Sequence, residues 1–465
     1  MPSRLRGAAP VPGRRRRGLL LLHELRALLG VAGPIIVAQV GAVAMHTTDT
    51  IMVGPLGAEA LAAAGIASAI HVTMYMLCFG TLMGMGPLVS QAFGAGDLRE
   101  CRRLLVQGTW LALLLGVPLG LAHLAGGELA RALGQQPRVA ELAGGYLVAL
   151  APGAPVLLLF AALRQYLEGM GLTRPAMVVT FVAVLLNVAA NQVLIFGVGG
   201  WVEPMGVVGS GWATTLARGW MLLALAGYVA SRPSLNPFRG ASLRPHAARL
   251  RRMLRIGAPI GAQLVAEVGI FACAAVMMGW LGPVQQAAHQ VTINLASVTF
   301  MVAMGTSLAG SIRVGQHVGA GSTRGVRRAA LGTYLVATGF MGMCALLFLA
   351  LPEFLIGLYT TDPRIVGIGV SLLFMAAAFQ VFDGAQVAGL QVLRGAADTR
   401  VPMLITLAGY WLVGAPAAWY LGFRTSLGPT GIWAGLVVGL AVVALMLAWR
   451  VRRVVWRRGP IARAA

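Results

Sequence analysis

The sequence predicts an all-α polytopic membrane protein with twelve transmembrane helices. The helices are expected to form two parallel six-helix lobes, related by a pseudo-twofold axis along the membrane normal. Three observations lead to this fold class: apolar segments recur along the whole chain, arginine alternates between the connections, and the two halves of the sequence repeat one another.

The apolar composition indicates a membrane protein. Of the 465 residues, 58% are hydrophobic and 11% are charged, and the mean hydropathy is +0.79. A soluble domain carries about 25% charged residues, whereas a helix needs about 20 apolar residues to cross the hydrocarbon core. Segments of that length predict twelve spans, at residues 28–53, 60–90, 104–127, 139–162, 175–198, 205–230, 256–280, 285–312, 329–351, 365–390, 402–422 and 429–449.

The distribution of arginine predicts how these spans are oriented. All 36 basic residues are arginine, and 31 of them fall in the termini and connections on one side of the membrane. Arg218 lies within the sixth span, and the other four lie on the opposite side: Arg131, Arg138, Arg364 and Arg424. Cytoplasmic connections are enriched in basic residues, so both termini are expected on the cytoplasmic side of a cell inner membrane. The net charge of +22 thus indicates topology and contact with membrane lipids, not binding of nucleic acid.

An internal repeat predicts the two lobes. A shift of 225 residues places Gly94–Gly96 on Gly319–Gly321 and Arg99 on Arg324, within a match that continues for about 70 residues. Each half holds six spans, so both halves start on the same side and the repeat is parallel. Rocking of two such lobes in one chain is typical of a monomeric transporter. The predicted organisation is a basic tail (1–27), a first lobe (28–230), a cytoplasmic linker (231–255), a second lobe (256–449) and a second basic tail (450–465).

Three acidic side chains are predicted to lie inside the membrane: Asp49, Glu267 and Asp383. A charge near the bilayer centre costs about 2.5–3.5 kcal/mol on insertion scales, so the fold has to offset roughly 8–10 kcal/mol for the three. Acids that are kept at this cost mark proton or cation sites that face a cleft between the lobes.

Two of these acids have an alternative role to weigh, whereas Glu267 lies near mid-membrane, where a purely structural role is hard to find. Asp49 lies about one turn before Gly54 and is also placed to act as an interfacial cap. Asp383 and Arg394 lie in the same helix, but their separation of eleven residues corresponds to about 16 Å, which is too far for direct pairing. Arg218 is either a structural counter-charge or part of the site.

Neutral polar residues in the same spans are further candidates. Asn187 and Asn191 are four residues apart, so both amides project from one face of a helix. They either hold a carboxylate or join helices, through hydrogen bonds worth about 1 kcal/mol or less. Phe379, one turn before Asp383, either faces a bound cation or packs in the core. The remaining candidates, open to the same alternatives as the amides, are Gln39, Gln290 and Asn294.

The sequence does not favour catalysis. The four cysteines show no paired spacing, so neither a disulfide nor a metal site is predicted from them. The seven histidines are scattered, and no HExxH motif is present. Without lysine, the phosphate-binding pattern GxxxxGK[ST] is impossible. The chain is therefore predicted to be neither an enzyme nor an ATP-driven pump, and to need no cofactor.

The first span carries a motif that identifies a family. The segment Asp49-Thr50-Ile51-Met52-Val53-Gly54 resembles the first-helix signature of the multidrug and toxic compound extrusion (MATE) transporters. Matches to the same family run from about Leu28 to the twelfth span, so they cover nearly the whole chain. In chain order they include Leu56-Gly57, Gly209–Thr214, Ala287–Gln290, Arg313–Gly315, Leu393–Gly395 and Asp398-Thr399.

This resemblance implies roles for the candidate residues. Asp49 matches the acid of the first lobe, and Asn187 and Asn191 match the polar pair on the fifth helix. Glu267 and Asp383 match the second-lobe acids that bind the coupling cation in the NorM-like branch. If export is driven by sodium, Na⁺ is expected between these two acids.

The resemblance also implies a function. Members of the family export organic cations and other amphipathic drugs in exchange for inward-moving Na⁺ or H⁺. Asp362 matches an acid proposed to contact cationic drugs, with a loop-cap role as the alternative, and Phe379 takes a position where some relatives have tyrosine. The expected substrate cleft comprises Gln290, Asp362, Phe379, Asn294 and Gln39.

The alternative function is a lipid-linked oligosaccharide flippase of the same superfold. A pyrophosphate headgroup calls for buried basic side chains in the cleft. The predicted spans hold three acids and one arginine, which favours cationic substrates.

Overall fold

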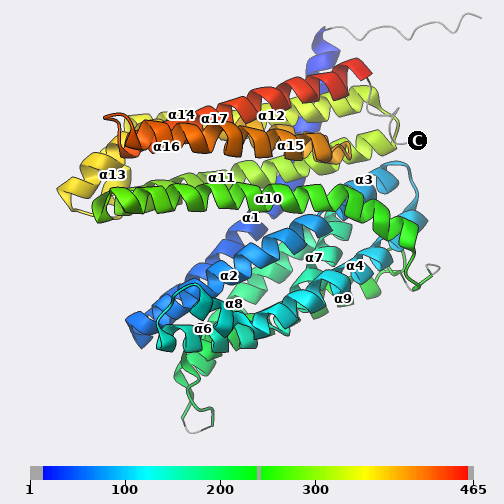
Figure 1. Cartoon of the computed structure of the whole chain (residues 1–465). Helices are drawn as coiled ribbons and strands as arrows, with labels where there is room; N and C mark the ends of the chain where they lie inside the picture. Colours follow the sequence, from blue (N-terminus) through cyan, green and yellow to red (C-terminus); the bar gives the residue numbers. More distant parts are fainter. Residues whose placement is uncertain (1–13, 200, 238–241, 459–465) are drawn as a thin grey trace, which may run out of the picture.

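The computed structural model describes residues 14–199, 201–237 and 242–458, and its long elements are helices (Figure 1). The first half contains α1 (Arg14–Val53), α2 (Ala58–Leu82), α3 (Met85–Gly94), α4 (Leu98–Leu124), α5 (Gly126–Ala132), α6 (Pro137–Leu150), α7 (Gly153–Gly169), α8 (Arg174–Phe196) and α9 (Gly206–Ala230). The second half contains α10 (Ala247–Leu281), α11 (Pro283–Gly319), α12 (Thr323–Ala350), α13 (Pro352–Gly357), α14 (Pro363–Gly395), α15 (Arg400–Leu407), α16 (Ala415–Phe423) and α17 (Pro429–Val451). A π-helix at Ala408–Gly414 joins α15 to α16.

The described residues contain ten helices long and apolar enough to cross a membrane, or eleven when the bent pair α6–α7 counts as one span. The pair bends by 46° where Pro152 precedes α7, because proline has no N–H for the helix and its ring crowds the preceding turn. The predicted sixth span corresponds to α9, which is 25 residues long but is not among those ten helices. The helix count is thus consistent with the twelve predicted spans.

Two helices begin earlier than the predicted spans. Helix α1 starts at Arg14 and α10 at Ala247, inside the stretches expected to be a tail and a linker. Leucine, alanine and arginine dominate both extensions, and these residues are good helix formers whether or not the membrane surrounds them. Residues 1–13 and 459–465 of the predicted tails lie outside the described residues.

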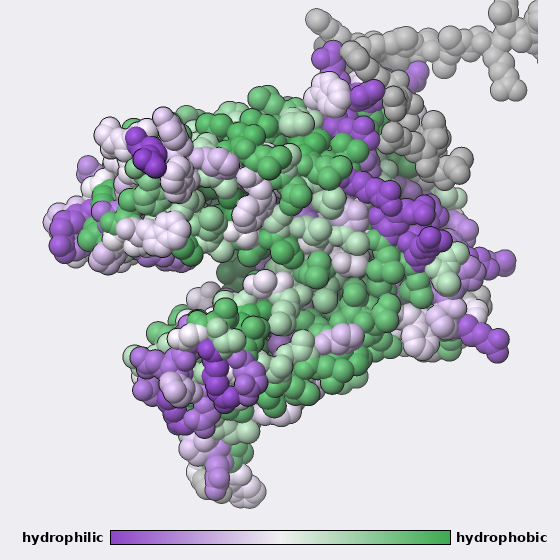
Figure 2. Space-filling view, viewed as in Figure 1, coloured by the Kyte–Doolittle hydropathy of each residue, from purple (hydrophilic) through white to green (hydrophobic). Residues whose placement is uncertain are grey.

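The helices form two bundles that diverge toward one end (Figure 1). Helices α2–α9 and the second half of α1 form the first lobe on one side, and α10–α17 form the second lobe on the other. The first half of α1 lies along the second lobe, where it packs against α11 and α12. The lobes meet where α2 packs against α10 and where α1 and α3 pack against α11. Figure 2 shows hydrophilic residues at both ends of the molecule, with the surface hollowed between the lobes at one of them, called here the open end, and not at the other. The latter, where α4, α8, α10 and α12 begin, is called the arginine-rich end.

Contacts at the arginine-rich end follow the internal repeat. A Cβ atom at Gly94 would overlap the carbonyl oxygen of Gln316, and one at Gly319 would overlap that of Gln91. These are two equivalent contacts, because the shift of 225 residues converts Gly94 into Gly319 and Gln91 into Gln316. A twofold axis requires this reciprocity, so the predicted pseudo-twofold relation between the lobes is confirmed.

The close approach at Gly319 leads to a testable expectation. We expect Gly319→Val to force the lobes apart at the arginine-rich end, because its side chain meets backbone atoms that cannot move aside; overpacking of this kind costs about 1–3 kcal/mol. Double electron–electron resonance between spin labels at Arg99 and Arg324 should show longer distances. The control is Gly339→Val in α12, where a Cβ atom meets open space. Unchanged distances in the Gly319 variant would contradict this packing.

Candidate cation and substrate sites in the cleft

The first-lobe site is built around the carboxylate of Asp49 on α1. Its Oδ1 accepts hydrogen bonds from the amide groups of Asn187 (3.1 Å) and Asn191 (2.6 Å) on α8. Its Oδ2 accepts one from the hydroxyl of Thr214 on α9, at 2.8 Å. All four side chains are buried. Asn187 and Asn191 therefore project from one face of α8, as their spacing predicts, and both point at Asp49.

This site can exchange a proton with little rearrangement. The three donors satisfy an ionised carboxylate, which only accepts hydrogen bonds. A hydroxyl both donates and accepts, so Thr214 can rotate to accept a hydrogen bond when Oδ2 of Asp49 carries a proton. The Oδ1 atom of Asn191 is buried without a hydrogen-bond partner among the described residues, so it is a further acceptor beside the carboxylate.

The second-lobe site brings Glu267 and Asp383 together. The two acids, from α10 and α14, line one cleft of about 240 Å³. Its walls are mostly apolar and include Phe271, Phe300 and Phe379. Among the described residues, no basic side chain lies within 4.0 Å of either acid. Two carboxylates in one apolar cleft repel each other unless a proton or a cation lies between them.

A chain of hydrogen bonds orients one of these acids. Gln386 donates from Nε2 to Oε1 of Glu267 at 3.1 Å and accepts from the hydroxyl of Tyr410 at 2.8 Å. Tyr410 lies in the π-helix between α15 and α16, and such irregular turns are frequent at functional sites. Asp383 is buried, at 7% exposed, yet it accepts no hydrogen bond from the described residues. Asp383 is therefore the acid that most needs an external partner.

Arg394 does not pair with Asp383. Its guanidinium donates to Oε1 of Gln263 at 3.2 Å, and Gln263 lies one turn before Glu267 on α10. The separation along α14 predicted this outcome.

Arg218 contacts one histidine, which in turn contacts a second. Its Nη2 lies 3.0 Å from Nε2 of His71, and Nδ1 of His71 lies 3.0 Å from Nε2 of His123. A guanidinium only donates, so His71 has to accept at Nε2 and to donate from Nδ1 to His123. Arg218 thus forms part of a buried chain of basic groups in the first lobe and binds neither acid site directly.

One substrate candidate lines the second-lobe cleft, and another is not among its lining residues. Phe379 lines the second-lobe cleft and packs edge-on against Phe271 and Trp433, with ring centroids 6.0 and 5.8 Å apart. Gln290 is exposed near the start of α11.

The other three substrate candidates have partners outside both acid sites. Gln39 accepts a hydrogen bond from Arg164 at 3.2 Å, and Asn294 accepts one from the hydroxyl of Tyr359 at 3.2 Å. Asp362 caps α14 and pairs with Arg364 at 2.9 Å. Hydrogen bonds from the side chain and backbone of Arg364 lower the pKa of Asp362.

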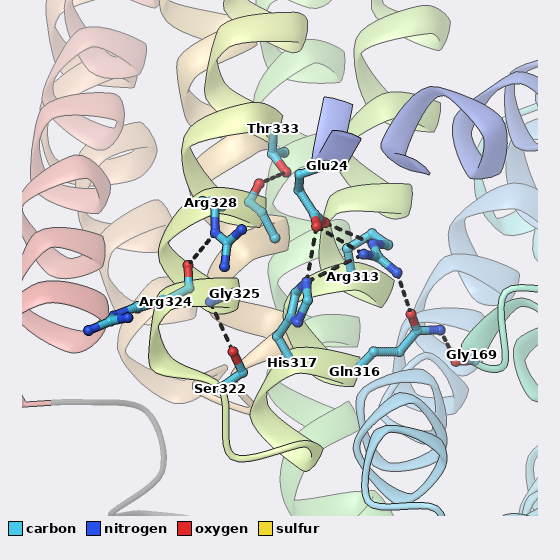
Figure 3. A network of polar contacts seen from close by, with 11 residues as sticks. Glu24, Gly169, Arg313, Gln316, His317, Ser322, Arg324, Gly325, Arg328 and Thr333 are labelled. Carbon is cyan, nitrogen blue, oxygen red and sulfur yellow. Dashed lines mark hydrogen bonds and ion pairs between the residues drawn. The ribbon is translucent and has the colours of Figure 1, made fainter. Parts of the chain in front are cut away.

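At the arginine-rich end, a network of polar contacts joins α11 to α1 and to the end of α7 (Figure 3). Glu24 on α1 accepts two hydrogen bonds from the guanidinium of Arg313 on α11, at 2.8 and 2.9 Å. His317 approaches the same carboxylate at 3.2 Å, and Gln316 donates to the carbonyl of Gly169 at 3.2 Å. Parallel hydrogen bonds between arginine and a carboxylate are strong and directional. The cleft therefore opens at one end while this network holds the other end shut.

Weakening this ion pair should open the arginine-rich end. We expect Glu24→Gln to shift spin labels at Arg99 and Arg324 toward longer distances, because the amide replaces charged hydrogen bonds worth about 1.5–3 kcal/mol. Glu128→Gln is the control, since Glu128 pairs with Arg131 within the first lobe and away from this end. Equal distance distributions in both variants would show that the Glu24 pair does not hold the lobes together.

Sequence reasoning missed Thr214, Gln386, Tyr410 and Glu24. Gln386 lies three residues after Asp383, a spacing that places both on one helix face and was the available signal. Threonine and tyrosine are common in apolar helices, so Thr214 and Tyr410 do not stand out in the sequence. Only the packing of α9 and of the π-helix brings them to the acids. Glu24 falls in the stretch expected to be a tail.

Comparisons with known proteins agree with this architecture. The sequence profile of the MatE family matches residues 34–193 and 259–420. The Probable multidrug resistance protein NorM of Pseudomonas putida is 38% identical over 455 residues, which cover 95% of this chain and 98% of that relative. The Multidrug resistance protein PmpM of Pseudomonas aeruginosa is 36% identical over 448 residues, which cover 94% of this chain and 93% of that relative.

Solved structures show the same fold. The eukaryotic MATE transporter AtDTX14 has a TM-score of 0.85 at 22% identity and covers 96% of this chain and 100% of its own. The crystal structure of MATE in the bent conformation has a TM-score of 0.86 at 21% identity, with 94% and 97% covered. These likenesses confirm the predicted fold class. The family profile and the relatives above 30% identity show that the chain belongs to the MatE family, the multidrug and toxic compound extrusion transporters.

Proposed function

We propose that this protein exports organic cations and amphipathic drugs by antiport with Na⁺ or H⁺. The observation that carries the proposal is the pair of unlike acidic sites, one in each lobe, in a molecule whose surface is hollowed between the lobes at one end. An inward-moving cation and an outward-moving organic cation can then compete for negative charge in the same molecule. The multidrug resistance names of the relatives support this choice of substrate.

The proposed orientation places the arginine-rich end in the cytoplasm of a bacterium, with the open end facing outward. The arginine asymmetry along the sequence supports it. Both termini then lie on the cytoplasmic side of the inner membrane. The moving units are the two predicted lobes, residues 28–230 and 256–449, joined by the stretch 231–255.

The two sites are suited to different coupling ions. Asp49 and Thr214 share a hydrogen bond whose direction can reverse, which suits a proton. Glu267 and Asp383 offer carboxylate oxygens in a cleft of about 240 Å³, and hard cations such as Na⁺ prefer oxygen ligands. The chain therefore has a residue set for either ion.

Coupling follows from the preference of each ligand for one arrangement of the lobes. A ligand shifts a conformational equilibrium only by its difference in affinity between two states. We propose that the coupling ion enters from the open end and favours release of the drug, and that the ion leaves after the Glu24–Arg313 network has opened. Drug then binds from the cytoplasm and the network closes again.

Drug susceptibility tests the substrate class. A bacterial strain without its own drug exporters should become more resistant to ethidium and other organic cations when it produces this protein, and should retain less ethidium. An anionic dye of similar size is the control and should accumulate as before. No change in ethidium retention, despite protein in the membrane, would contradict drug export and favour the flippase alternative.

A further inference from the structure

A second cleft lies outside the space between the lobes. It measures about 700 Å³ and is bounded by α1, α8 and α9 near the arginine-rich end. Gly30 on α1, Pro175 and Val178 on α8, and Tyr228 on α9 are among its lining residues. The space beside Gly30 is open, since a Cβ atom there would meet nothing within 4 Å. The cleft therefore offers room for a ligand beside three membrane-spanning helices.

The rim of this cleft is positively charged. Arg174, at the start of α8, lines it and is exposed. The guanidinium of Arg232 lies over the ring of Tyr228, 4.5 Å from the ring centroid. In the part of the chain that the structure describes, neither arginine has a carboxylate within 4.0 Å, whereas Arg249 and Arg313 at the same end are paired with glutamate. Two cations at this rim are available to an external anion.

The interior of the cleft is apolar. Leu172, Val178, Val179 and Ala224 line it together with the ring of Tyr228. Val178 is 53% exposed and lies in a helix that is apolar enough to span the membrane. Its side chain is therefore placed to contact hydrocarbon chains. A charged rim above an apolar interior matches a molecule with an anionic head and hydrocarbon chains.

We propose that this cleft binds an anionic phospholipid, with the phosphate between Arg174 and Arg232 and an acyl chain along Val178 and Gly30. Basic clusters at the cytoplasmic ends of membrane helices attract anionic lipid headgroups, and arginine binds phosphate through directed hydrogen bonds. The proposed orientation of the chain assigns the lipid to the inner leaflet. The site does not depend on the protein being a drug exporter.

Native mass spectrometry of the full chain in detergent tests this site. The probes are phosphatidylglycerol and phosphatidylcholine with the same acyl chains. The wild-type protein should retain phosphatidylglycerol roughly fivefold or more over phosphatidylcholine, as attraction to two arginines implies. Arg174→Gln with Arg232→Gln should lose this preference. Arg99→Gln with Arg251→Gln is the matched control, because it removes two exposed and unpaired charges from the same end and should keep the preference.

Two further measurements test which part of the lipid is bound and whether it binds in this cleft. Gly30→Leu should lower retention of phosphatidylglycerol by filling the cleft without changing charge. Inorganic phosphate should not displace the lipid, because it has no acyl chain for the apolar interior. The proposal is wrong if the Arg174 and Arg232 double variant keeps the preference, or if the control pair loses it equally. It is also wrong if Gly30→Leu has no effect or if phosphate competes as well as lipid does.

Discussion

Replacing Glu267 by glutamine or Asp383 by asparagine is expected to lower drug export strongly while the protein stays in the membrane. Each change keeps the size of the side chain but removes one of the two charges that share an apolar cleft. Coupling free energies between ligands are about 1–3 kcal/mol, so losing this site should reduce export roughly 5- to 150-fold. The measurement is ethidium efflux from cells, normalised to the amount of membrane-inserted protein.

Asp362→Asn is the matched control for these variants. Asp362 is an acid on the same helix as Asp383 but pairs with Arg364 at the open end, so its loss should leave most export intact. Full activity in both Glu267→Gln and Asp383→Asn would remove the second-lobe site from the mechanism. A loss in Asp362→Asn equal to that of the acid variants would place the drug at the open end instead.

Asp49→Asn should have the second largest effect and should act on proton-driven transport. An asparagine at position 49 is not ionised, so it does not take up and release a proton at the atom that Thr214 contacts. Efflux driven by a pH gradient should fall roughly 5- to 150-fold, on the same scale of coupling energies. Dye efflux in vesicles with an imposed pH gradient measures it.

Thr214→Val tests the hydrogen bond to Asp49 separately from the packing of the helices. Valine is close to threonine in shape but lacks the hydroxyl, so the variant keeps the helix contacts and loses one donor to Asp49. We expect a smaller loss than in Asp49→Asn, and a changed dependence of efflux on pH. An unchanged response to a pH gradient in Asp49→Asn would exclude this residue from proton coupling.

Much of the fold can be predicted from the sequence because hydropathy, arginine placement and the repeat each report on a strong physical constraint. The membrane requires long apolar helices, and duplication leaves equivalent contacts such as Gly94 and Gly319. The break between α6 and α7 and the early start of α1 were not predicted. They depend on local helix geometry and on the burial of Glu24 against Arg313, which lies 289 residues away.

The acids of the site can be predicted because buried charge is costly, but their neighbours cannot. The spacing of Asn187 and Asn191 predicted that both lie on one helix face, and the structure shows that this face is turned to Asp49. Gln39 has a similar side chain in a similar helix, yet it meets Arg164 instead of a site acid. Neutral amides have many acceptable partners in apolar helices, so only tertiary packing decides among them.

Dye transport into everted membrane vesicles tests the proposed antiport most directly. In such vesicles the cytoplasmic face points outward, so export appears as dye accumulation in the lumen. The proposed mechanism predicts accumulation when Na⁺ or H⁺ is more concentrated in the lumen than outside, and no accumulation in vesicles that contain the Glu267→Gln, Asp383→Asn and Asp49→Asn changes together. Accumulation that persists after both ion gradients are collapsed would contradict antiport.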